Sequence, residues 1–388
     1  MAHYLYENAN GRRVNTHSYS GGSSFNECAR KYRYQRLDGW REKAVRAAME
    51  FGNAWEAAIQ TYHKDMDLAA ARAEWRKGWT AAKSLELAYK DSESWSEMFK
   101  QGDELLRLYA IRLPDLPIVN PRFQLNFKKE VFPDSEYSGI EDTSFIDMLV
   151  EAGPAQHLLL PPVKSREPRP LLIDIKTSGK PYPVDARMLR LDPQLRRYSW
   201  TTGVETVAFL VGVKNPRSLD RGHYVTLLTN TIQGKAGEIF VVFEDASDEF
   251  DLRVILLTES QYGAYLDAQK GVRGKALVSL KEKWAEDGFV VNGADVTRQQ
   301  IQFLATVITQ QERDETGEAV GREVLEICAS NQDGFWPQRP GVRFPNNHCA
   351  WCPFLGLCID DNTRVKDKLI NITTSPAPAR DWLDVMEE

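Results

Sequence analysis

The sequence predicts an α/β fold in which a central sheet is flanked by helices. Three observations favour it: helical periodicity before residue 122, strand-like apolar runs between residues 122 and 257, and helical patterns after residue 258. With 388 residues and 42% hydrophobic content, the chain can bury a sizeable core in one large domain or two smaller ones. We expect an N-terminal segment at 1–22, a helical region at 23–121, a sheet-containing core at 122–257, a helical addition at 258–345, a cysteine-rich segment at 346–372 and a flexible acidic tail at 373–388.

The helical region begins with a capping-box pattern. Ser24 and Glu27 stand three residues apart, which predicts the start of a helix that carries Cys28. The next helix shows an apolar stripe at steps of three and four that should face the core: Ala44, Ala48, Phe51, Trp55, Ile59 and Tyr62. Residues 66–112 continue as helical material rich in Ala, Glu, Lys and Trp.

Strand patterns follow from about residue 122. The predicted strands lie at 123–127, 144–150, 171–175, 206–213 and 238–243. Five prolines between 153 and 170 predict a long loop. Asp192 followed by Pro193 is typical of a helix start, so a helix should run to about Trp200. Further helices are expected at 258–286 and 298–330.

Composition narrows the class of protein. No apolar run reaches the roughly 20 residues that a membrane helix needs, and the N-terminus lacks a basic stretch followed by an apolar one, so we expect a cytoplasmic protein that does not bind membranes. Five cysteines suit a reducing compartment better than a disulfide framework. A phosphate-binding loop of the Gly-x4-Gly-Lys-Ser/Thr type does not occur, so the chain has no motor of its own.

The charge is unevenly distributed. The formal net charge is −6, yet residues 161–198 contain nine Lys and Arg against four Asp and Glu. A local basic surface could contact phosphates. The same charges could equally be solvated side chains on loops and helices.

A charged pair lies within the predicted strand 171–175. Leu172, Asp174 and Lys176 should share one face of the strand, because side chains two apart point the same way. Buried charges cost free energy unless they serve each other, a metal or a substrate. Asp147 repeats the pattern on the preceding strand. A structural salt bridge between Asp174 and Lys176 is the alternative interpretation.

Two aspartates and a lysine suit phosphodiester hydrolysis. The carboxylates can hold a hard divalent ion, which polarises the phosphate and lowers the pKa of a bound water, while the lysine stabilises developing negative charge.

The order of these motifs resembles the RecB-type branch of the PD-(D/E)xK nuclease superfamily. Asp147 precedes Asp174-Ile175-Lys176, and Gln194 and Tyr198 follow as a Gln-x3-Tyr pair on the predicted helix. The resemblance implies a mixed sheet of the restriction-endonuclease-like type, with 122–257 as the nuclease core. It also implies the catalytic residues Asp147, Asp174, Lys176, Gln194 and Tyr198. Without that context, Gln194 and Tyr198 would be an ordinary surface Gln and a half-buried Tyr.

The same resemblance implies a metal ligand on the helix before the sheet. Gly52 followed four residues later by Glu56 offers that ligand, and glycine inside a helix suggests a close neighbour on this face. His63 is the competing ligand. The implied set for Mg²⁺ or Mn²⁺ is Glu56, Asp147, Asp174 and the backbone carbonyl of Ile175.

Four cysteines complete the pattern: Cys28, Cys349, Cys352 and Cys358. One cysteine before the core and three after it resemble the iron–sulfur nucleases of this superfamily, namely the CRISPR-associated RecB-like exonucleases and the AddB nuclease domain. The resemblance implies a structural [4Fe-4S] cluster, although four thiolates could equally bind zinc, with His348 beside them. Cys328 continues an apolar helix face and is expected to be a buried core residue.

The implied function is a metal-dependent DNA exonuclease that acts at strand ends in recombination, repair or phage DNA processing. DNA is the expected partner, with a helicase, recombinase or single-strand annealing protein as candidate protein partners. Two alternatives remain: a CRISPR-adaptation nuclease that trims DNA, and a non-catalytic DNA-end-binding adaptor.

Overall fold

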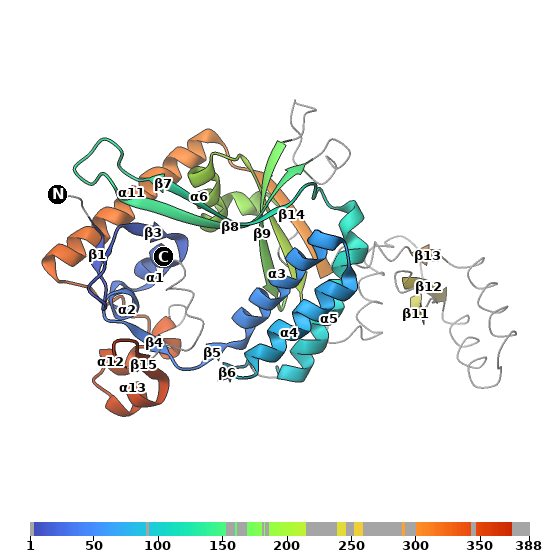
Figure 1. Cartoon of the computed structure of the whole chain (residues 1–388), viewed down its shortest axis with the longest axis horizontal. Helices are drawn as coiled ribbons and strands as arrows, with labels where there is room; N and C mark the ends of the chain where they lie inside the picture. Colours follow the sequence, from blue (N-terminus) through green and yellow to red (C-terminus); the bar gives the residue numbers. More distant parts are fainter. Residues whose placement is uncertain are drawn as a thin grey trace, which may run out of the picture.

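The computed structural model describes residues 4–90, 93–152, 160, 169–180, 182, 186–214, 239–245, 252–258, 289–291, 300–342 and 347–374. It confirms the α/β class, with a central mixed sheet and flanking helices (Figure 1). The strand order is β14-β10-β9-β8-β3, and β7 also pairs with β8. These strands are β3 (Thr16–Ser18), β7 (Arg122–Glu130), β8 (Glu141–Ala152), β9 (Arg169–Ser178), β10 (Thr206–Val213) and β14 (Ile301–Val307).

The sheet contains both parallel and antiparallel pairs. β9 and β10 run parallel, as do β3 and β8, whereas β7–β8, β8–β9 and β10–β14 are antiparallel. The parallel pair β9–β10 requires a crossover, which α6 (Pro193–Thr202) supplies. The prediction of α6 from its cap is confirmed, because the Asp192 side chain accepts from the backbone N–H groups of Gln194 and Leu195.

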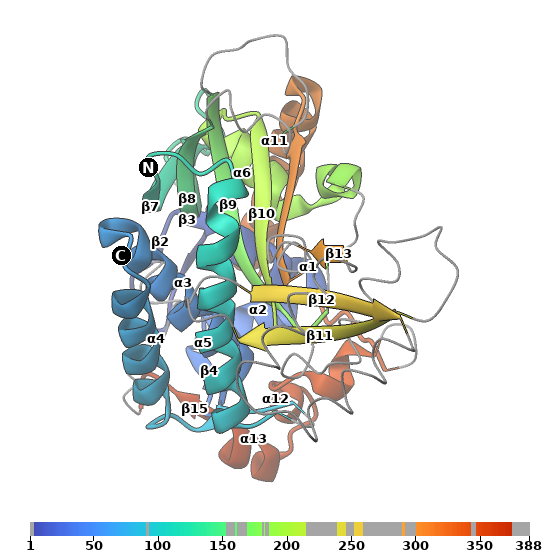
Figure 2. The same cartoon turned by 90° about the vertical axis from the view of Figure 1, so that its right-hand side faces the viewer.

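Helices cover both faces of the sheet (Figures 1 and 2). On one side lie α3 (Ala47–Asp65), α4 (Leu68–Ala82) and α5 (Trp95–Arg112), and on the other lie α6 and α11 (Gln310–Asp333). Each face has its own hydrophobic core. The first core includes Leu171, Ile173 and Ile175 of β9, and the second includes Leu172.

The predicted apolar stripe of α3 is confirmed, except that Ala44 precedes the helix. Phe51, Trp55 and Ile59 are fully buried, and Tyr62 is 8% exposed. Trp55 packs against β10 at Gly212, where an added Cβ would lie 2.9 Å from the indole Cη2. Glycine is therefore required there for α3 to approach the sheet closely.

The predicted helix start at Ser24 is wrong. α1 (Tyr19–Glu27) begins earlier, because Ser18 caps it by accepting from the backbone N–H of Gly21. Ser24 instead donates its hydroxyl to Gln35 Oε1 (2.7 Å) and Glu27 pairs with Lys31. Cys28 therefore stands between α1 and α2 (Ala29–Arg36).

The predicted helix over 298–330 is also wrong in its first part. Residues Ile301–Val307 form β14, because this apolar run pairs antiparallel along the edge of β10. The helix α11 begins at Gln310, and its N-cap Thr309 forms a capping box with Glu312 in the first turn. The predicted helix over 258–286, the loop over 153–170 and the tail over 373–388 lie largely outside the described residues. The predicted strand at 238–243 is β11 (Ile239–Asp245), in a separate sheet with β12 (Leu252–Thr258) and β13 (Phe289–Val291).

The two ends of the described chain lie together. β4 (Trp40–Glu42) pairs antiparallel with β15 (Leu369–Asn371), which follows α12 (Leu355–Cys358) and α13 (Asn362–Lys368). Two other short pairs are β1 (Tyr6–Glu7) with β2 (Arg13–Val14), and β5 (Val45–Arg46) with β6 (Leu87–Ala88).

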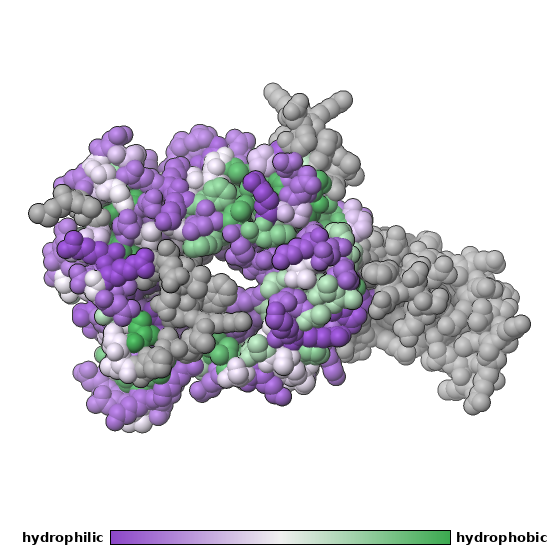
Figure 3. Space-filling view, viewed as in Figure 1, coloured by the Kyte–Doolittle hydropathy of each residue, from purple (hydrophilic) through white to green (hydrophobic). Residues whose placement is uncertain are grey.

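The outer surface is mainly hydrophilic, and Figure 3 shows it hollowed between the α3 side and the α1 side of the molecule. Among the helices that the structure describes, none combines the length and apolar character needed to cross a bilayer.

Replacing Gly212 by Ala should destabilise the protein. The new Cβ meets the buried Trp55 ring, so we expect the free energy of unfolding to fall by about 1–3 kcal/mol, the usual cost of overpacking. Urea denaturation measures it. Gly179→Ala is the matched control, since no atom lies within 4 Å of its added Cβ. Equal losses in both variants would contradict the steric explanation.

Candidate active site

The predicted aspartates lie where β8 and β9 separate. Pairing between these strands ends at Met148 and Ile173. One position further, Asp147 Oδ2 accepts from the backbone N–H of Ile175 at 2.8 Å. A side chain thus takes over the hydrogen bond that the ladder would otherwise supply, and the two strands leave room between them for polar groups.

The side chains of Asp174 and Lys176 lie next to each other on one face of β9, as predicted. Asp174 is 1% exposed, and its Oδ2 lies 2.6 Å from Lys176 Nζ. Lys176 Nζ also donates to Gln194 Oε1 at 3.1 Å. The salt bridge that was the alternative interpretation is therefore present, and it is part of a larger network.

The helix α6 supplies the rest of that network. Gln194 Nε2 donates to Asp174 Oδ1 at 3.1 Å and to the hydroxyl oxygen of Tyr198 at 2.6 Å. Gln194 and Tyr198 are four residues apart on α6 and face the same way, which the sequence spacing predicts. Both side chains therefore belong to the same cluster as Asp174.

Glu56 reaches this cluster from α3. Its Oε1 accepts from Gln60 Nε2 at 3.3 Å and from the amide of Gln124 on β7. The competing ligand His63 lies elsewhere, because its Nε2 is 2.7 Å from the Tyr109 hydroxyl, and burial lowers its pKa to about 4. The structure thus places Glu56, and not His63, with the aspartates.

The steric explanation for Gly52 is not confirmed. An added Cβ would lie 3.6 Å from Thr177 Oγ1, which is an ordinary van der Waals contact. Alanine therefore fits at this position in α3.

Burial and mutual repulsion raise the carboxyl pKa values. Burial raises the pKa of Glu56 to about 7, with the charge of Asp174 adding to it. Burial, followed by the charges of Asp174 and Glu56, raises the pKa of Asp147 well above its usual range. The pKa of Asp174 is raised by burial although Lys176 opposes the shift. The three carboxylates are thus poorly hydrated and near one another, so an additional positive charge would stabilise their ionised forms.

The donor set suits a hard cation, although the side chains are not gathered around one. Among the described residues, no three His, Cys, Asp or Glu lie close enough to hold one ion. Glu56 is instead held by Gln124, Asp147 by the N–H of Ile175, and Asp174 by Lys176. Carboxylate oxygens are nevertheless the ligands that Mg²⁺ and Mn²⁺ prefer, so these side chains have the right chemistry for either ion. To bind one ion together, the three carboxylates would have to rotate away from their present partners.

The four predicted cysteines lie in one region. Burial raises the pKa of Cys352 to about 11, and the charges of Cys358 and Cys28 add to this shift. The pKa of Cys358 is raised by burial, and Cys28 and Cys349 add to it. Cys28 thus lies within electrostatic range of Cys352 and Cys358. Over the part of the chain that is described, however, the thiols are not at metal-binding distances.

Packing between the two chain ends brings these cysteines together. The Tyr34 ring lies 6.1 Å from that of Phe354, and its hydroxyl donates to the carbonyl oxygen of Leu357 at 3.3 Å. His348 is turned to the carbonyl oxygen of Arg339 (2.7 Å). Cys328 is 4% exposed within a hydrophobic core, as predicted.

A buried polar network behind α6 was missed from the sequence. Arg197 Nε donates to both oxygens of Asp142 on β8 at 2.9 and 3.0 Å. Arg197 also pairs with Glu323 on α11 at 3.2 Å, and Glu323 contacts the buried His17. These residues show no spacing that would connect them in the sequence, because each comes from a different element. Gln124 was missed for the same reason.

The expected basic surface is largely neutralised where it is described. Arg190 and Arg196 pair with Glu312 and Glu315 of α11, both at 2.9 Å. Lys164 and Arg166 lie outside the described residues.

Removing the Glu56 charge should stabilise the protein at alkaline pH when no metal is present. The folded-state pKa of Glu56, about 7, exceeds the ordinary 4.5, so the contribution of Glu56 to stability is lost as pH rises from about 5 to 7. Without metal, Glu56→Gln should raise the free energy of unfolding at pH 8 by on the order of 2 kcal/mol and leave it nearly unchanged at pH 5. Urea denaturation in chelator checks this, with the exposed Glu136→Gln as control. A Glu56→Gln curve parallel to that of the wild type would reject the shift.

Comparisons with known proteins do not assign a family. No protein-family model and no curated protein sequence matches the chain. A solved structure entitled "Crystal structure of SSO0001" is similar over 51% of this chain and 79% of that chain, with 12% sequence identity and a TM-score of 0.20. Overlap at this level transfers no property to the present chain.

Proposed function

We propose that the protein is a metal-dependent DNA exonuclease that hydrolyses phosphodiester bonds at DNA ends. One observation carries the proposal: three acidic side chains and one amine from α3, β8 and β9 interact in one partly buried region, namely Glu56, Asp147, Asp174 and Lys176. A salt bridge that only stabilises the fold needs one carboxylate. Two further carboxylates nearby would raise the free energy of the folded state by repulsion.

The topology supports the same proposal. Along the chain, α3 is followed by β7, β8, β9, α6 and β10, with α4 and α5 inserted after α3. A helix, three strands, a helix and a strand, with the acidic residues where the second and third strands separate, resemble the restriction-endonuclease-like core of the PD-(D/E)xK superfamily. A similar fold alone does not show a similar function, so the proposal rests mainly on the residues of the site.

Each residue has a distinct role. Glu56, Asp147, Asp174 and the carbonyl of Ile175 would hold Mg²⁺ or Mn²⁺, which when bound polarises a phosphate and makes water more acidic. The pKa of Lys176 is raised by Asp174 and Asp147, although burial opposes the shift, so Lys176 stays protonated and can stabilise negative charge on the phosphate. Gln194 holds the Lys176 amine in place through its Oε1.

We further propose that the four cysteines hold a structural [4Fe-4S] cluster, with zinc as the alternative. The spacing of Cys349, Cys352 and Cys358 in the sequence supports this, as does the β4–β15 pairing between segments that follow Cys28 and Cys358. A shared metal centre would close a loop of more than 300 residues between Cys28 and Cys349 and so constrain the unfolded chain. The proposal requires these thiols to close further around the cluster.

A second candidate is a DNA-end-binding adaptor without catalysis. It is favoured by the 2.6 Å contact between Lys176 and Asp174, because an ion pair can neutralise Asp174 without a metal. Either function would place the chain beside a helicase, a recombinase or a single-strand annealing protein. A nuclease assay on the purified chain separates the two candidates.

Lys176→Ala should abolish Mg²⁺- or Mn²⁺-dependent digestion of linear DNA. The loss should be at least about 100-fold in rate, the scale of removing one electrostatic stabiliser from a transition state, while DNA binding survives. Degradation of end-labelled DNA measures the rate. Lys180→Ala is the matched control, because this exposed lysine follows the same strand. Undiminished cleavage by Lys176→Ala would refute the catalytic assignment.

The cluster has a separate test in the colour of anaerobically purified protein. We expect a brown solution with bound iron and sulfide, and a colourless Cys352→Ser variant with a lower melting temperature. Cys328→Ala should remain brown, because Cys328 is packed in a hydrophobic core and is not one of the four proposed ligands. A colourless wild type with stoichiometric zinc would favour the zinc alternative, and one without metal would remove the cluster.

A further inference from the structure

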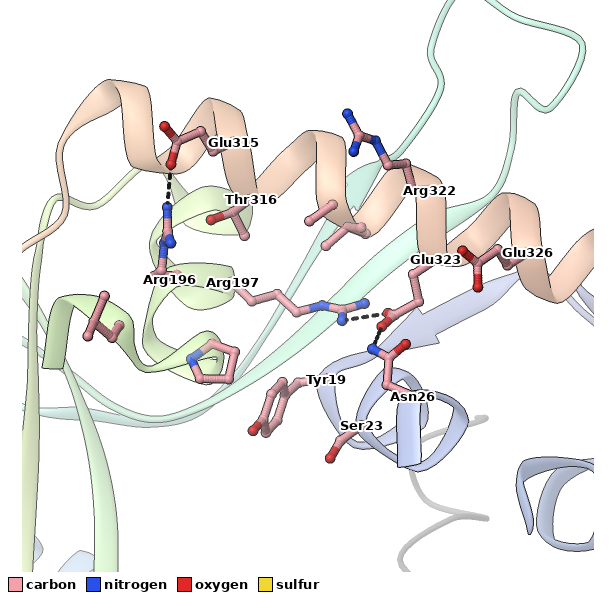
Figure 4. Close-up of a pocket in the computed structure, with 14 residues that line it drawn as sticks. Tyr19, Ser23, Asn26, Arg196, Arg197, Glu315, Thr316, Arg322, Glu323 and Glu326 are labelled. Atoms are coloured by element: carbon pink, nitrogen blue, oxygen red, sulfur yellow. Dashed lines mark hydrogen bonds and ion pairs between the residues drawn. The ribbon is translucent and has the colours of Figure 1, made fainter. Parts of the chain in front are cut away.

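A polar pocket lies between α1, α6 and α11 (Figure 4). Its volume of about 580 Å³ is in the range of small-molecule sites. The pocket is distinct from the carboxylate cluster, and none of the candidate catalytic residues lines it. Its purpose is therefore not explained by the chemistry described above.

The charges that line the pocket are balanced. Arg196, Arg197 and Arg322 face the same space as Glu315, Glu323 and Glu326. Two of these arginines are already paired within the pocket, Arg196 with Glu315 at 2.9 Å and Arg197 with Glu323 at 3.2 Å. A phosphate or other anion would meet as many carboxylates as guanidinium groups, so the lining does not select an anion. It suits an uncharged ligand that carries both donors and acceptors.

One part of the lining is flat and less polar. Tyr19, the first residue of α1, lies at the edge of the pocket in Figure 4, and Pro193, the first residue of α6, also lines the pocket. Tyr19 is partly exposed. A tyrosine ring in the wall of a pocket suits stacking by a planar ligand.

Tyr19 also lies at the border with the candidate active site. Burial raises the pKa of its hydroxyl, and the charges of Asp192, Lys176, Asp174 and Arg197 all act on it. Tyr19 also follows Ser18, which pairs with Thr143 of β8, the strand that carries Asp147.

The helix α6 separates the two sites by its own thickness. Gln194 and Tyr198 point to the Asp174–Lys176 pair, whereas Pro193, Arg196 and Arg197 line the pocket. Pro193, which lines the pocket, is therefore the direct neighbour in sequence of Gln194, which contacts Lys176 and Asp174.

We infer that the pocket receives one nucleobase of the DNA strand whose phosphate lies at Lys176, stacked on Tyr19. This inference rests on the proposed function. A nucleobase is planar and uncharged and offers both donors and acceptors, which matches the balanced lining and the tyrosine ring. Because every base has a π-face, stacking on Tyr19 accepts any sequence, as digestion of DNA ends requires.

The test is an abasic scan with the wild-type protein in chelator, so that no strand is cut. Oligonucleotides with a single abasic site at successive positions from the end are compared for binding by fluorescence anisotropy. We expect a roughly 5- to 100-fold loss of affinity at one position and little change elsewhere, the scale of one base–aromatic stack.

Variants at Tyr19 provide a second measurement. Tyr19→Ala should lose affinity for intact DNA by the same factor and no longer distinguish the abasic position, whereas Tyr19→Phe should bind as the wild type does. Tyr89→Ala is the matched control, because Tyr89 is 38% exposed and follows β6, away from this pocket. The abasic scan stands by itself if Tyr19→Ala does not fold.

The outcomes separate this inference from the proposed function. Lys176-dependent cleavage together with equal affinities across the abasic scan overturns the nucleobase pocket and leaves the nuclease proposal standing. A protein that neither cuts nor binds DNA overturns both. A position-specific loss that is retained in Tyr19→Ala overturns the stacking assignment.

Discussion

The buried Asp174–Lys176 pair is the interaction on which the rest of the site depends. A carboxylate that is 1% exposed in a central strand would be costly alone, and its ion pair with Lys176 and hydrogen bond from Gln194 offset that cost. Because Gln194 comes from α6, the position of this helix is coupled to the charge on β9. The pairing of Arg197 with Asp142 then holds the same helix against β8.

The fold provides this site by interrupting a sheet at one point. β8 and β9 pair up to Met148 and Ile173 and then diverge, and Asp147 takes the N–H of Ile175. Continued pairing would leave the carboxylates no space to turn toward Glu56. Because Gly212 has no side chain, the Trp55 ring of α3 can pack closely against β10. The same helix, α3, carries Glu56. Sheet divergence and helix packing thus act together.

Local patterns predicted a substantial part of this arrangement. The stripe of α3, the Asp192 cap of α6 and the alternation in β9 each depend on residues close in sequence, and each is confirmed. The start of α1 was mispredicted because Ser18 caps the helix, whereas Ser24 donates its hydroxyl to Gln35. β14 was mispredicted because a short apolar run fits a helix or a strand until its partner is known. The contacts of Gln124 and Arg197 join segments that are distant in the sequence, so no residue spacing predicts them.

The chemistry of Gln194 explains why an amide suits the centre of this network. Lys176 needs an acceptor and Asp174 needs a donor, and Gln194 offers both from one side chain. A glutamate there would add a fourth carboxylate to three that already repel, and a lysine would compete with Lys176 for Asp174. Since the amide carries no charge, it can orient the amine without neutralising it. Lys176 therefore stays positively charged, and under the proposed nuclease function this charge stabilises the phosphate.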